Sequence, residues 1–428
     1  MWKCYLVVIL SVLQCVTCRT VKRCSTNGLE EPTQELQVSI IVSPVAIDNI
    51  SRHLILSWDN VSPSNGGWVG LFDKEPSANS VSLALFKVQP QISSGWETTG
   101  FYEKAVASNE LGFTKKCLNF WAAYISADNS TVIASSCLQT EPTWMADMQT
   151  ALSPLMLRQI FLVGSHDSGS YEEYNPSTSE NLVTKYTITQ EDDILSQLIY
   201  GVRYLDIRAA YYPSTNETWW VNHGVMKIHP MKLILDDVKT FLENTNEIVI
   251  LDFHEFPAGF GSGLDIHTKL VEYLKEEIGE FAASPSLTWN ARTGDIWSSG
   301  KRLIVSYNNN DAVAQSDMLW PAVSQQWGNV QTLEDLYSYL SQVMASPPGS
   351  KAWSAMVELT PTTMQVITDE LGGLRRMAAM VNQNVTAWYR GTWGKTVNIV
   401  SADFFRDTGL VEAAISWNHF RSQQLACK

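Results

Sequence analysis

Beyond about residue 150, apolar runs of strand length alternate with stretches of helical periodicity, and this alternation constrains the fold more than any other sequence feature. Parallel strands joined by crossover helices produce such an order. The strand-like runs are residues 160–163, 201–209, 218–224, 247–256, 302–309, 324–329, 353–361 and 397–405. About eight strands in roughly 270 residues predict an α/β fold, a closed (β/α)₈ barrel of the TIM type. A doubly wound sheet is the alternative, although this part of the chain has no glycine-rich phosphate loop.

The preceding hundred residues follow a different pattern. Short runs rich in valine, isoleucine and aromatic residues are separated by turn clusters, at residues 36–44, 53–60, 66–73, 81–88, 119–126 and 131–138. Regular short strands of this kind predict a small all-β sandwich in front of the barrel. The predicted boundaries are 1–18 for a signal peptide, 19–138 for the sandwich, 139–150 for a linker and 151–428 for the barrel.

The first residues resemble a secretory signal. Lys3 precedes a short apolar run, and Val16-Thr17-Cys18 offers a small residue at the cleavage point. We therefore expect a secreted, extracellular protein; an uncleaved anchor is the alternative. Acidic residues outnumber basic ones by 44 to 30, giving a net charge of −14, which argues against nucleic-acid binding. Nothing in the sequence specifies an oligomeric state.

Cysteines and sequons agree with an oxidising compartment. Cys24, Cys117, Cys137 and Cys427 follow the predicted signal, and two disulfides could pair them in three ways. A bridge between Cys117 and Cys137 across a predicted hairpin is favoured, which leaves Cys24 with Cys427; free buried thiols are the alternative. Five N-x-S/T sequons predict glycosylation, at Asn49, Asn60, Asn129, Asn216 and Asn384.

Three of the seven histidines stand near the ends of predicted strands: His166, His223 and His254. The carboxyl ends of parallel barrel strands open on one face, which holds the active site. Charged residues also stand near the ends of predicted strands, namely Asp167, Asp206, Arg208 and Asp403. Because the last strand of a closed barrel lies beside the first, Asp403 is expected to reach His166.

This set of residue types suits one reaction. Two histidines on opposite sides of a phosphate can act as base and acid near neutral pH, and carboxylates behind them fix their tautomers. An arginine offers phosphate oxygens a forked and permanently charged partner. The set therefore predicts phosphodiester cleavage by an internal hydroxyl, with the guanidinium in place of a metal ion.

Four motifs in order, LVGSHDSGSY, YGVRYLDIRAAYY, WWVNHG and EIVILDFHEF, resemble the X region of phosphatidylinositol-specific phospholipase C, in the style of the bacterial enzymes and the animal X-domain-containing proteins. The resemblance runs from about residue 157 to 420 and implies a distorted (β/α)₈ barrel. It implies that His166 is the general base, oriented by Asp403. It likewise implies that His223 is the general acid, assisted by Asp167.

The same resemblance assigns phosphate binding to Arg208 and a supporting role to Asp206. Calcium-dependent members of the family place carboxylates or an amide where this chain has Asp167, Asp206, Arg208 and His254. A guanidinium among the ligands repels a dication, and histidine is a poor ligand for a hard cation. The resemblance therefore implies the branch without a metal cofactor.

The chain differs from the bacterial enzymes at the positions expected to contact the inositol head group. Three positions are candidate substrate contacts: His254, Tyr307 and Trp327. No charged residue there clearly matches those that bind inositol hydroxyls in the bacterial enzymes.

In the β region, WDNVSPSNGGWVGLFD with NFWAAYI resembles sandwich modules of the SKICH type. This module is expected to pack on the barrel, or else to dock a protein or membrane.

The leading hypothesis is thus a secreted phosphodiesterase of the phospholipase C type. Its substrate would be a phosphoinositide, a GPI anchor or a related glycerophosphodiester, with peripheral contact to a membrane. The alternative is a catalytically silent barrel that binds a phosphorylated polyol or a cell-surface partner. A metal-dependent glycerophosphodiesterase ranks last, because it predicts a carboxylate ligand at the position of Arg208.

Overall fold

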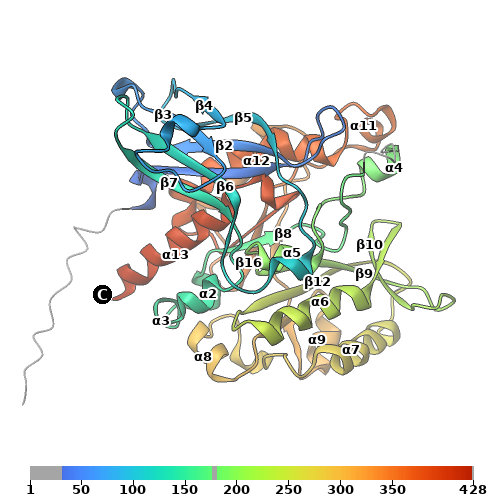
Figure 1. The fold of residues 1–428 in the computed structure, drawn as a ribbon. Helices are drawn as coiled ribbons and strands as arrows, with labels where there is room; N and C mark the ends of the chain where they lie inside the picture. Colours follow the sequence, from blue (N-terminus) through green and yellow to red (C-terminus); the bar gives the residue numbers. More distant parts are fainter. Residues whose placement is uncertain (1–30, 176–180, 427–428) are drawn as a thin grey trace, which may run out of the picture.

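The computed structural model describes residues 31–175 and 181–426, which form an antiparallel sandwich packed against a curled parallel sheet with helices around it (Figure 1). The predicted signal peptide, Cys24 and Cys427 lie outside the described residues. In the described part of the chain, no helix has both the length and the apolar character needed to cross a bilayer.

The parallel sheet forms the barrel. Its order is β14-β13-β12-β9-β8-β17-β16-β15, and every neighbouring pair along this path is parallel. The strands are β8 (Leu162–Ser165), β9 (Tyr204–Tyr211), β12 (Val249–Ala258), β13 (Leu303–Tyr307), β14 (Leu319–Pro321), β15 (Ser324–Gln326), β16 (Trp353–Met356) and β17 (Ile399–Ala402). Only two residues separate the edge strands β14 and β15 in the sequence, so the sheet curls until these two edges lie near each other, although no hydrogen-bonded ladder joins them. This is the predicted distorted (β/α)₈ barrel.

Two expectations about the barrel were wrong in detail. The run at 218–224 is not a barrel strand: β10 (Trp219–His223) pairs antiparallel with β9 and with β11 (Met226–Pro230), forming a hairpin. The eighth parallel strand is instead β14, whose short run carries a proline and was not recognised. The helical stretch over residues 363–390 is divided into two helices, because Gly372 and Gly373 adopt φ values of 70° and 96° between them.

Helices cover the outside of the barrel. The longer ones are α6 (Met231–Asn244), α7 (Asp265–Ile278), α10 (Leu333–Ala345), α12 (Leu374–Arg390) and α13 (Leu410–Ala426). Shorter ones include α4 (Leu182–Lys185), α5 (Ile194–Ile199), α8 (Thr293–Ser298), α9 (Asn310–Gln315) and α11 (Thr363–Thr368). Their apolar sides pack against a continuous buried core, which gives the strand ends on the opposite side a rigid base.

The sandwich has two antiparallel sheets, in the orders β1-β2-β5 and β4-β3-β6-β7. The strands are β1 (Gln37–Ser43), β2 (His53–Asp59), β3 (Trp68–Phe72), β4 (Phe86–Val88), β5 (Gly95–Tyr102), β6 (Cys117–Ile125) and β7 (Val132–Gln139). Strand β5 was not expected, because exposed polar side chains interrupt its pattern. A disulfide joins Cys117 to Cys137 across β6 and β7, as predicted.

The segment between sandwich and barrel is packed rather than extended. It forms α2 (Trp144–Asp147) and α3 (Gln149–Leu152), and the side chains of Trp144 and Met145 are buried. The carboxylate of Glu247 accepts hydrogen bonds from the backbone N–H groups of Met145 and Ala146, at 3.1 and 2.7 Å. These bonds satisfy the first turn of α2 and fix it to the barrel.

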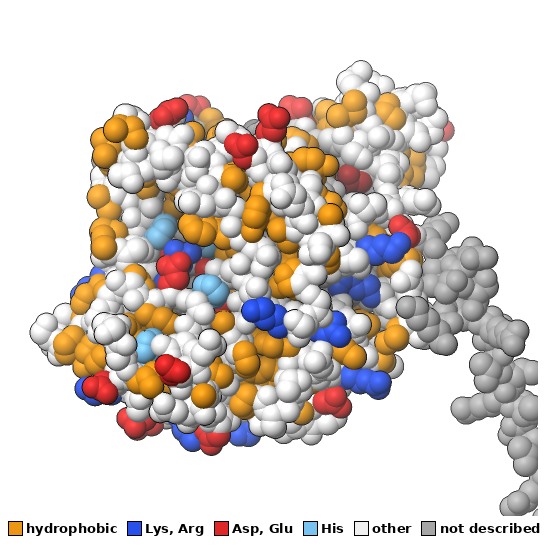
Figure 2. Space-filling model, turned by 180° about the vertical axis from the view of Figure 1, so that it is seen from behind, with side chains coloured by type: hydrophobic (Ala, Val, Ile, Leu, Met, Phe, Trp, Pro, Cys, Tyr) orange, Lys and Arg blue, Asp and Glu red, His pale blue; other side chains and the backbone are white. Residues whose placement is uncertain are grey.

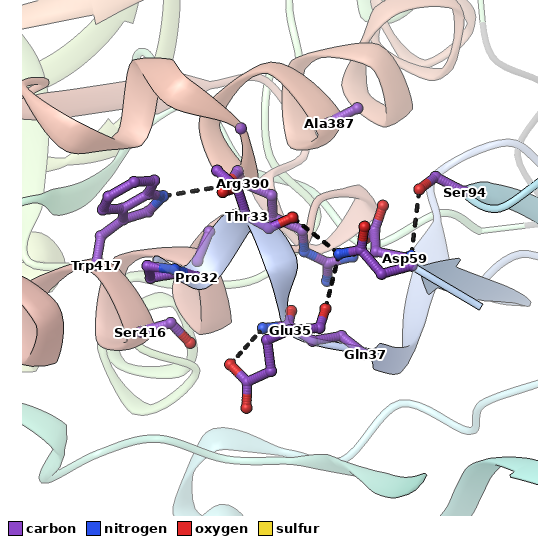
Figure 3. A pocket seen from close by; sticks show the side chains of 13 residues that line it. Pro32, Thr33, Glu35, Gln37, Asp59, Ser94, Ala387, Arg390, Ser416 and Trp417 are labelled. Atoms are coloured by element: carbon purple, nitrogen blue, oxygen red, sulfur yellow. Dashed lines mark hydrogen bonds and ion pairs between the residues drawn. The ribbon is translucent and has the colours of Figure 1, made fainter. Parts of the chain in front are cut away.

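Sandwich and barrel also share polar contacts. At one edge of the interface, Arg390 of α12 pairs with Asp59 of β2 at 2.6 Å and donates to the hydroxyl of Ser39 at 2.9 Å. A cavity of about 210 Å³ lies here, bordered by Arg390 and Trp417 (Figure 3). The indole N–H of Trp417 donates to the Arg390 carbonyl at 3.2 Å, so the polar groups around this cavity already serve the interface.

At another edge, a buried ionic cluster joins the two parts. Its members are Arg52 and Glu103 of the sandwich and Glu191, Asp192, Arg375 and Arg406 of the barrel. Arg52 contacts Asp192 at 2.9 Å, and Arg406 forms a bidentate pair with Glu103 at 2.8 and 3.0 Å. Three positive and three negative groups balance, as buried charges require.

Substitution Arg52→Met is expected to lower the free energy of unfolding by about 3–5 kcal/mol, because it leaves buried carboxylates without their cation. Urea denaturation of the whole chain measures this. The matched control is Lys275→Met, which breaks the exposed pair with Asp317 and should leave the free energy of unfolding nearly unchanged. Equal losses in the two variants would show that the cluster does not stabilise the interface.

The five sequons differ in solvent exposure and in the hydrogen bonds of their asparagine side chains. Asn49, Asn129 and Asn216 are exposed, whereas Asn384 is partly buried on α12. Asn60 is exposed, but its amide nitrogen donates to the carbonyls of Thr33 and Glu35, at 2.9 and 2.8 Å. The glycan-accepting nitrogen of Asn60 is therefore engaged in holding the chain before β1.

Candidate active site

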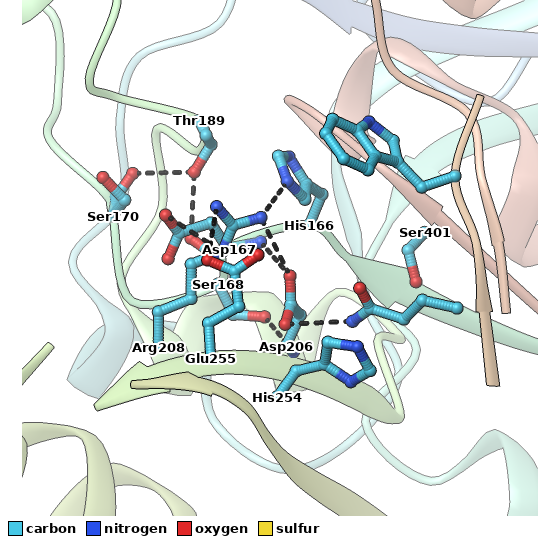
Figure 4. A network of polar contacts seen from close by, with 12 residues as sticks. His166, Asp167, Ser168, Ser170, Thr189, Asp206, Arg208, His254, Glu255 and Ser401 are labelled. Carbon is cyan, nitrogen blue, oxygen red and sulfur yellow. Dashed lines mark hydrogen bonds and ion pairs between the residues drawn. The ribbon is translucent and has the colours of Figure 1, made fainter. Parts of the chain in front are cut away.

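The six predicted catalytic residues lie together at the carboxyl ends of neighbouring strands. His166 and Asp167 follow β8, Asp206 and Arg208 belong to β9, Asp403 follows β17, and His223 ends β10. They surround a cavity of about 230 Å³ that His166, Arg208, His223 and Asp403 line directly. Figure 4 shows Arg208 between His166 and the acidic side chains.

His166 is held from both ring nitrogens. Because Ala402 pairs with Ser165, the residues after them lie side by side, and Nδ1 of His166 is 2.7 Å from Oδ1 of Asp403. Nη2 of Arg208 lies 2.5 Å from Nε2 of His166. A guanidinium only donates, so this contact leaves Nε2 without a proton and places the ring proton on Nδ1. This is the tautomer that a general base requires.

Two influences on the protonation of His166 oppose each other: the contact with Arg208 requires the neutral ring that a base needs, whereas nearby carboxylates favour the imidazolium. Burial disfavours the imidazolium, but the carboxylates of Glu358 and Asp403 outweigh it and raise the pKa of His166 to about 10. The side-chain amide of Gln190 donates to the carbonyls of His166 and Ala402, at 3.0 and 2.9 Å. Gln190 precedes the Glu191–Asp192 part of the ionic cluster, so the sandwich interface supports the backbone of the site.

His223 has the opposite character. Its Nδ1 donates to the Thr187 carbonyl at 2.5 Å and lies 3.9 Å from Oδ2 of Asp167. Burial and the positive charge of Arg208 lower the pKa of His223 to about 4. Since Nδ1 is engaged by a carbonyl, Nε2 is the nitrogen available for proton transfer. One cavity thus holds two imidazoles whose pKa values are shifted in opposite directions, an arrangement typical of acid–base catalysis.

Arg208 is surrounded by carboxylates. Its Nε is 3.6 Å from Asp167, its Nη2 is 3.7 Å from Asp206 and its Nη1 is 3.6 Å from Glu255. Arg208 keeps the pKa of Asp206 below its usual range against the effect of burial. Burial raises the pKa of Asp167 to about 7, and its side-chain oxygens have no hydrogen-bond partner among the described atoms.

Asp167 also has an unusual backbone. Its φ of 37° lies in the left-handed region, which is uncommon for a residue other than glycine. The chain turns sharply there because Oδ2 of Asp206 accepts a hydrogen bond from the Asp167 N–H at 2.9 Å. This turn directs the Asp167 carboxylate toward Arg208 and His223, as strain at a functional site often does.

Of the three predicted substrate contacts, only Trp327 lines the cavity. Its indole N–H donates to the Thr360 hydroxyl at 2.9 Å, and its ring is half exposed. His254 does not line the cavity; its Nδ1 binds Asp252 at 3.1 Å. The expectation for Tyr307 is corrected, because its ring is buried among aromatic side chains and its hydroxyl is 2.7 Å from Nδ1 of His267.

Five polar residues that line the cavity were not predicted from the sequence: Tyr186, Glu255, Gln325, Glu358 and Thr360. The amide of Gln325 donates to Asp206 at 3.1 Å, while Oε1 of Glu358 is 4.0 Å from Nε2 of His166. Burial raises the pKa of Glu358 to about 7. A carboxylate two residues after the apolar strand β16 was the available signal. Within the described residues, no group of three or more histidine, cysteine or acidic side chains is placed to hold a metal ion.

Comparison with known proteins agrees with the motifs. No family model matches the chain. Human PI-PLC X domain-containing protein 1 is 27% identical over 321 residues, covering 69% of this chain and 97% of the relative. Zebrafish (Danio rerio) PI-PLC X domain-containing protein 3 is 27% identical over 313 residues, covering 65% and 93%. The predicted resemblance to X-domain-containing proteins is thus confirmed.

Two bacterial structures are also similar. Phosphatidylinositol-specific phospholipase C from Listeria monocytogenes has a TM-score of 0.49 and 20% identity, covering 64% of this chain and 98% of its own. The enzyme from S. aureus, from work on its membrane binding, has a TM-score of 0.49 and 16% identity, covering 64% and 97%.

Proposed function

We propose that this chain, a relative of the PI-PLC X domain-containing proteins, is a phosphoric diester hydrolase of the phospholipase C type. Its substrate is phosphatidylinositol or a related glycerophosphodiester. The observation that carries the proposal is one cavity in which a guanidinium lies with two histidines, one oriented by a carboxylate and the other by a backbone carbonyl. These groups suit attack on phosphorus by a hydroxyl of the substrate itself.

In this reaction His166 is the general base. Once Arg208 turns from Nε2 of His166 to the phosphate oxygens, Nε2 removes the proton from the head-group hydroxyl next to the phosphate, and that oxygen forms a bond to phosphorus. As the bond from phosphorus to the diacylglycerol oxygen breaks, Nε2 of His223 gives that oxygen a proton. Arg208 stabilises the charge on the phosphate oxygens. The products are diacylglycerol and a cyclic inositol phosphate, which water opens in a slower second step.

His223 must carry a proton before it can donate one. Its low pKa in the free site comes from burial and from Arg208. A bound phosphodiester adds negative charge beside His223 and pairs with Arg208, and both effects raise the pKa of His223. Substrate binding therefore favours the protonated form of His223, and departure of the phosphate lowers the pKa of His223 again.

We further propose that the reaction needs no metal ion. The guanidinium of Arg208 lies 3.6 Å from Asp167 and 3.7 Å from Asp206, the two carboxylates that would otherwise attract a cation. A permanent positive charge at that distance repels a dication and supplies the charge stabilisation that the dication would provide.

The test is an assay of the purified, glycosylated chain on phosphatidylinositol vesicles, once with EDTA and once with calcium. Cyclic inositol phosphate is expected at equal rates in both, because no step uses a metal. Product formed only with calcium would overturn the metal-free proposal. No product under either condition would overturn the phosphatidylinositol assignment and favour the binding role.

The place of action is proposed to be the outside of the cell, at an outer membrane leaflet. The disulfide between Cys117 and Cys137 supports this, because disulfides persist in oxidising compartments. Exposed sequons at Asn49, Asn129 and Asn216 also fit glycosylation during secretion.

The mouth of the cavity is proposed to rest on the membrane. Exposed apolar side chains stand on the segments around it, at Leu182, Val183, Val225, Trp327, Met364 and Ile367. Helices α4 and α11 lie together there, since Lys185 pairs with Asp369 at 2.6 Å. Figure 2 shows histidine, basic and acidic side chains close together on one face, with apolar side chains around them. Because the whole chain is acidic, insertion of apolar side chains is the expected source of affinity.

The double variant Met364→Ser/Ile367→Ser is expected to weaken vesicle binding about tenfold or more for each residue, since each buried apolar side chain contributes about 1.5–3 kcal/mol. Sedimentation with neutral vesicles measures this. The matched control is Leu83→Ser/Ile92→Ser on the sandwich, whose side chains are 67% and 62% exposed against 65% and 63% for the pair on α11. Equal weakening by both double variants would contradict a specific membrane face.

A further inference from the structure

We propose that Glu358 determines the head group: its carboxylate accepts a hydrogen bond from the hydroxyl on the ring carbon next to the reacting hydroxyl. This inference rests on the proposed function and adds a substrate contact that the motifs do not contain. The predicted contacts at His254 and Tyr307 do not line the cavity, so the head group must be recognised by other residues.

Glu358 has the geometry of an unfilled acceptor. It follows β16, it lines the cavity, and its side chain is only 3% exposed. One carboxylate oxygen, Oε1, is 4.0 Å from Nε2 of His166, the atom that removes the proton. The other, Oε2, is buried without a hydrogen-bond partner among the described atoms. Because an unpartnered buried carboxylate oxygen is costly, this position is suited to a ligand donor.

The other polar side chains of the cavity are already engaged. The amide of Gln325 donates to Tyr204 and Asp206, and the indole N–H of Trp327 donates to Thr360. The Tyr186 hydroxyl contacts Asp369, and the Glu255 carboxylate lies 3.6 Å from Arg208 and is half exposed to solvent. Glu358 therefore stands out among these residues by its unused acceptor beside the base.

The charges around Glu358 select a neutral donor. Asp403 lines the same cavity as Glu358, so a phosphate on the ring would meet two carboxylates and be repelled. Arg208 lies among Asp167, Asp206 and Glu255. In the proposed reaction it binds the reacting phosphodiester, so it does not also bind a phosphate on the ring. A hydroxyl can donate to Glu358 without adding charge. Two adjacent hydroxyls of a polyol would thus bind Nε2 of His166 and the Glu358 carboxylate together.

The test is a cycle of two enzymes and two substrates. The unsubstituted chain and Glu358→Ala are assayed on phosphatidylinositol and on the analogue that lacks the hydroxyl next to the reacting one. A hydrogen bond to a charged group predicts that either change alone lowers kcat/KM roughly 10- to 150-fold. Both changes together should cost little more than one, because each removes the same contact.

The cycle separates the contact of Glu358 with the head group from the effect of Glu358 on the pKa of His166. Loss of the Glu358 charge also lowers the pKa of His166, but this effect applies to both substrates and cancels in the comparison. Glu358→Gln keeps the side-chain shape and should show the same coupling in weaker form. The control Glu370→Ala removes an exposed carboxylate beyond α11 and should leave both rates unchanged. Thermal melting of each variant shows that it folds.

Losses that multiply in the cycle would overturn the role of Glu358 while leaving the proposed function intact. Absence of hydrolysis by the unsubstituted chain would overturn both. A coupled loss confined to the Glu358 variants supports the head-group contact.

Discussion

Substitution of His166 or His223 by alanine is expected to lower kcat on phosphatidylinositol by about 10²- to 10⁴-fold, the usual contribution of a positioned acid or base. His166 removes a proton from the attacking hydroxyl, and its Nδ1 contact with Asp403 at 2.7 Å fixes the reactive tautomer. His223 acts only on the leaving oxygen. The two variants can therefore be told apart by the leaving group.

A substrate whose leaving group is an acidic phenol needs no general acid. With it, His223→Ala should recover most of its activity, whereas His166→Ala should stay impaired, because the attacking hydroxyl still needs a base. His419, an exposed histidine on α13, supplies the control His419→Ala, which should behave as the unsubstituted chain. Recovery of the His166 variant instead would reverse the two assignments.

The second large effect is expected at Arg208. Substitution Arg208→Gln should lower kcat by about 10²- to 10³-fold, as loss of a donor to transition-state charge does. Arg208→Lys should lose nearly as much, because an ammonium keeps the charge but not the planar fork that spans two phosphate oxygens. The same assays with EDTA measure both variants.

The exposed Arg376 provides the matched control Arg376→Lys, which should not change kcat. A further contrast comes from Asp206, whose low pKa depends on Arg208. Without the guanidinium the pKa of Asp206 rises, so the pH profile of Arg208→Gln should change as well as its rate. Full activity of Arg208→Lys would mean that charge alone is required.

Much of the site could be predicted from the sequence because its residues stand in strand-end positions. The carboxyl ends of parallel strands must share one face, so His166, Arg208 and Asp403 could be placed together without coordinates. The disulfide between Cys117 and Cys137 could be predicted because a hairpin brings its ends into contact. Each of these inferences depends on chain direction and local connection alone.

Other features depend on how strands curve and which side chains face inward. Tyr307 also ends a strand, yet it faces the aromatic core rather than the cavity. The hairpin of β10 and β11 has the composition of a barrel strand, and only its antiparallel pairing distinguishes it. Alternating apolar residues do not encode which neighbour a strand selects, so these errors could not be avoided from the pattern.

The sequence by itself determined the order of strands and helices, the parallel barrel and the residue types that transfer protons. The tertiary structure alone decided that Glu358 lies 4.0 Å from the base and that Arg52 and Glu103 bind the barrel's charged segments. The physical reason is that the spacing of apolar residues indicates only which side of a single helix or strand is buried. Distances between elements depend on register, sheet curvature and packing, which arise only when the whole chain has folded.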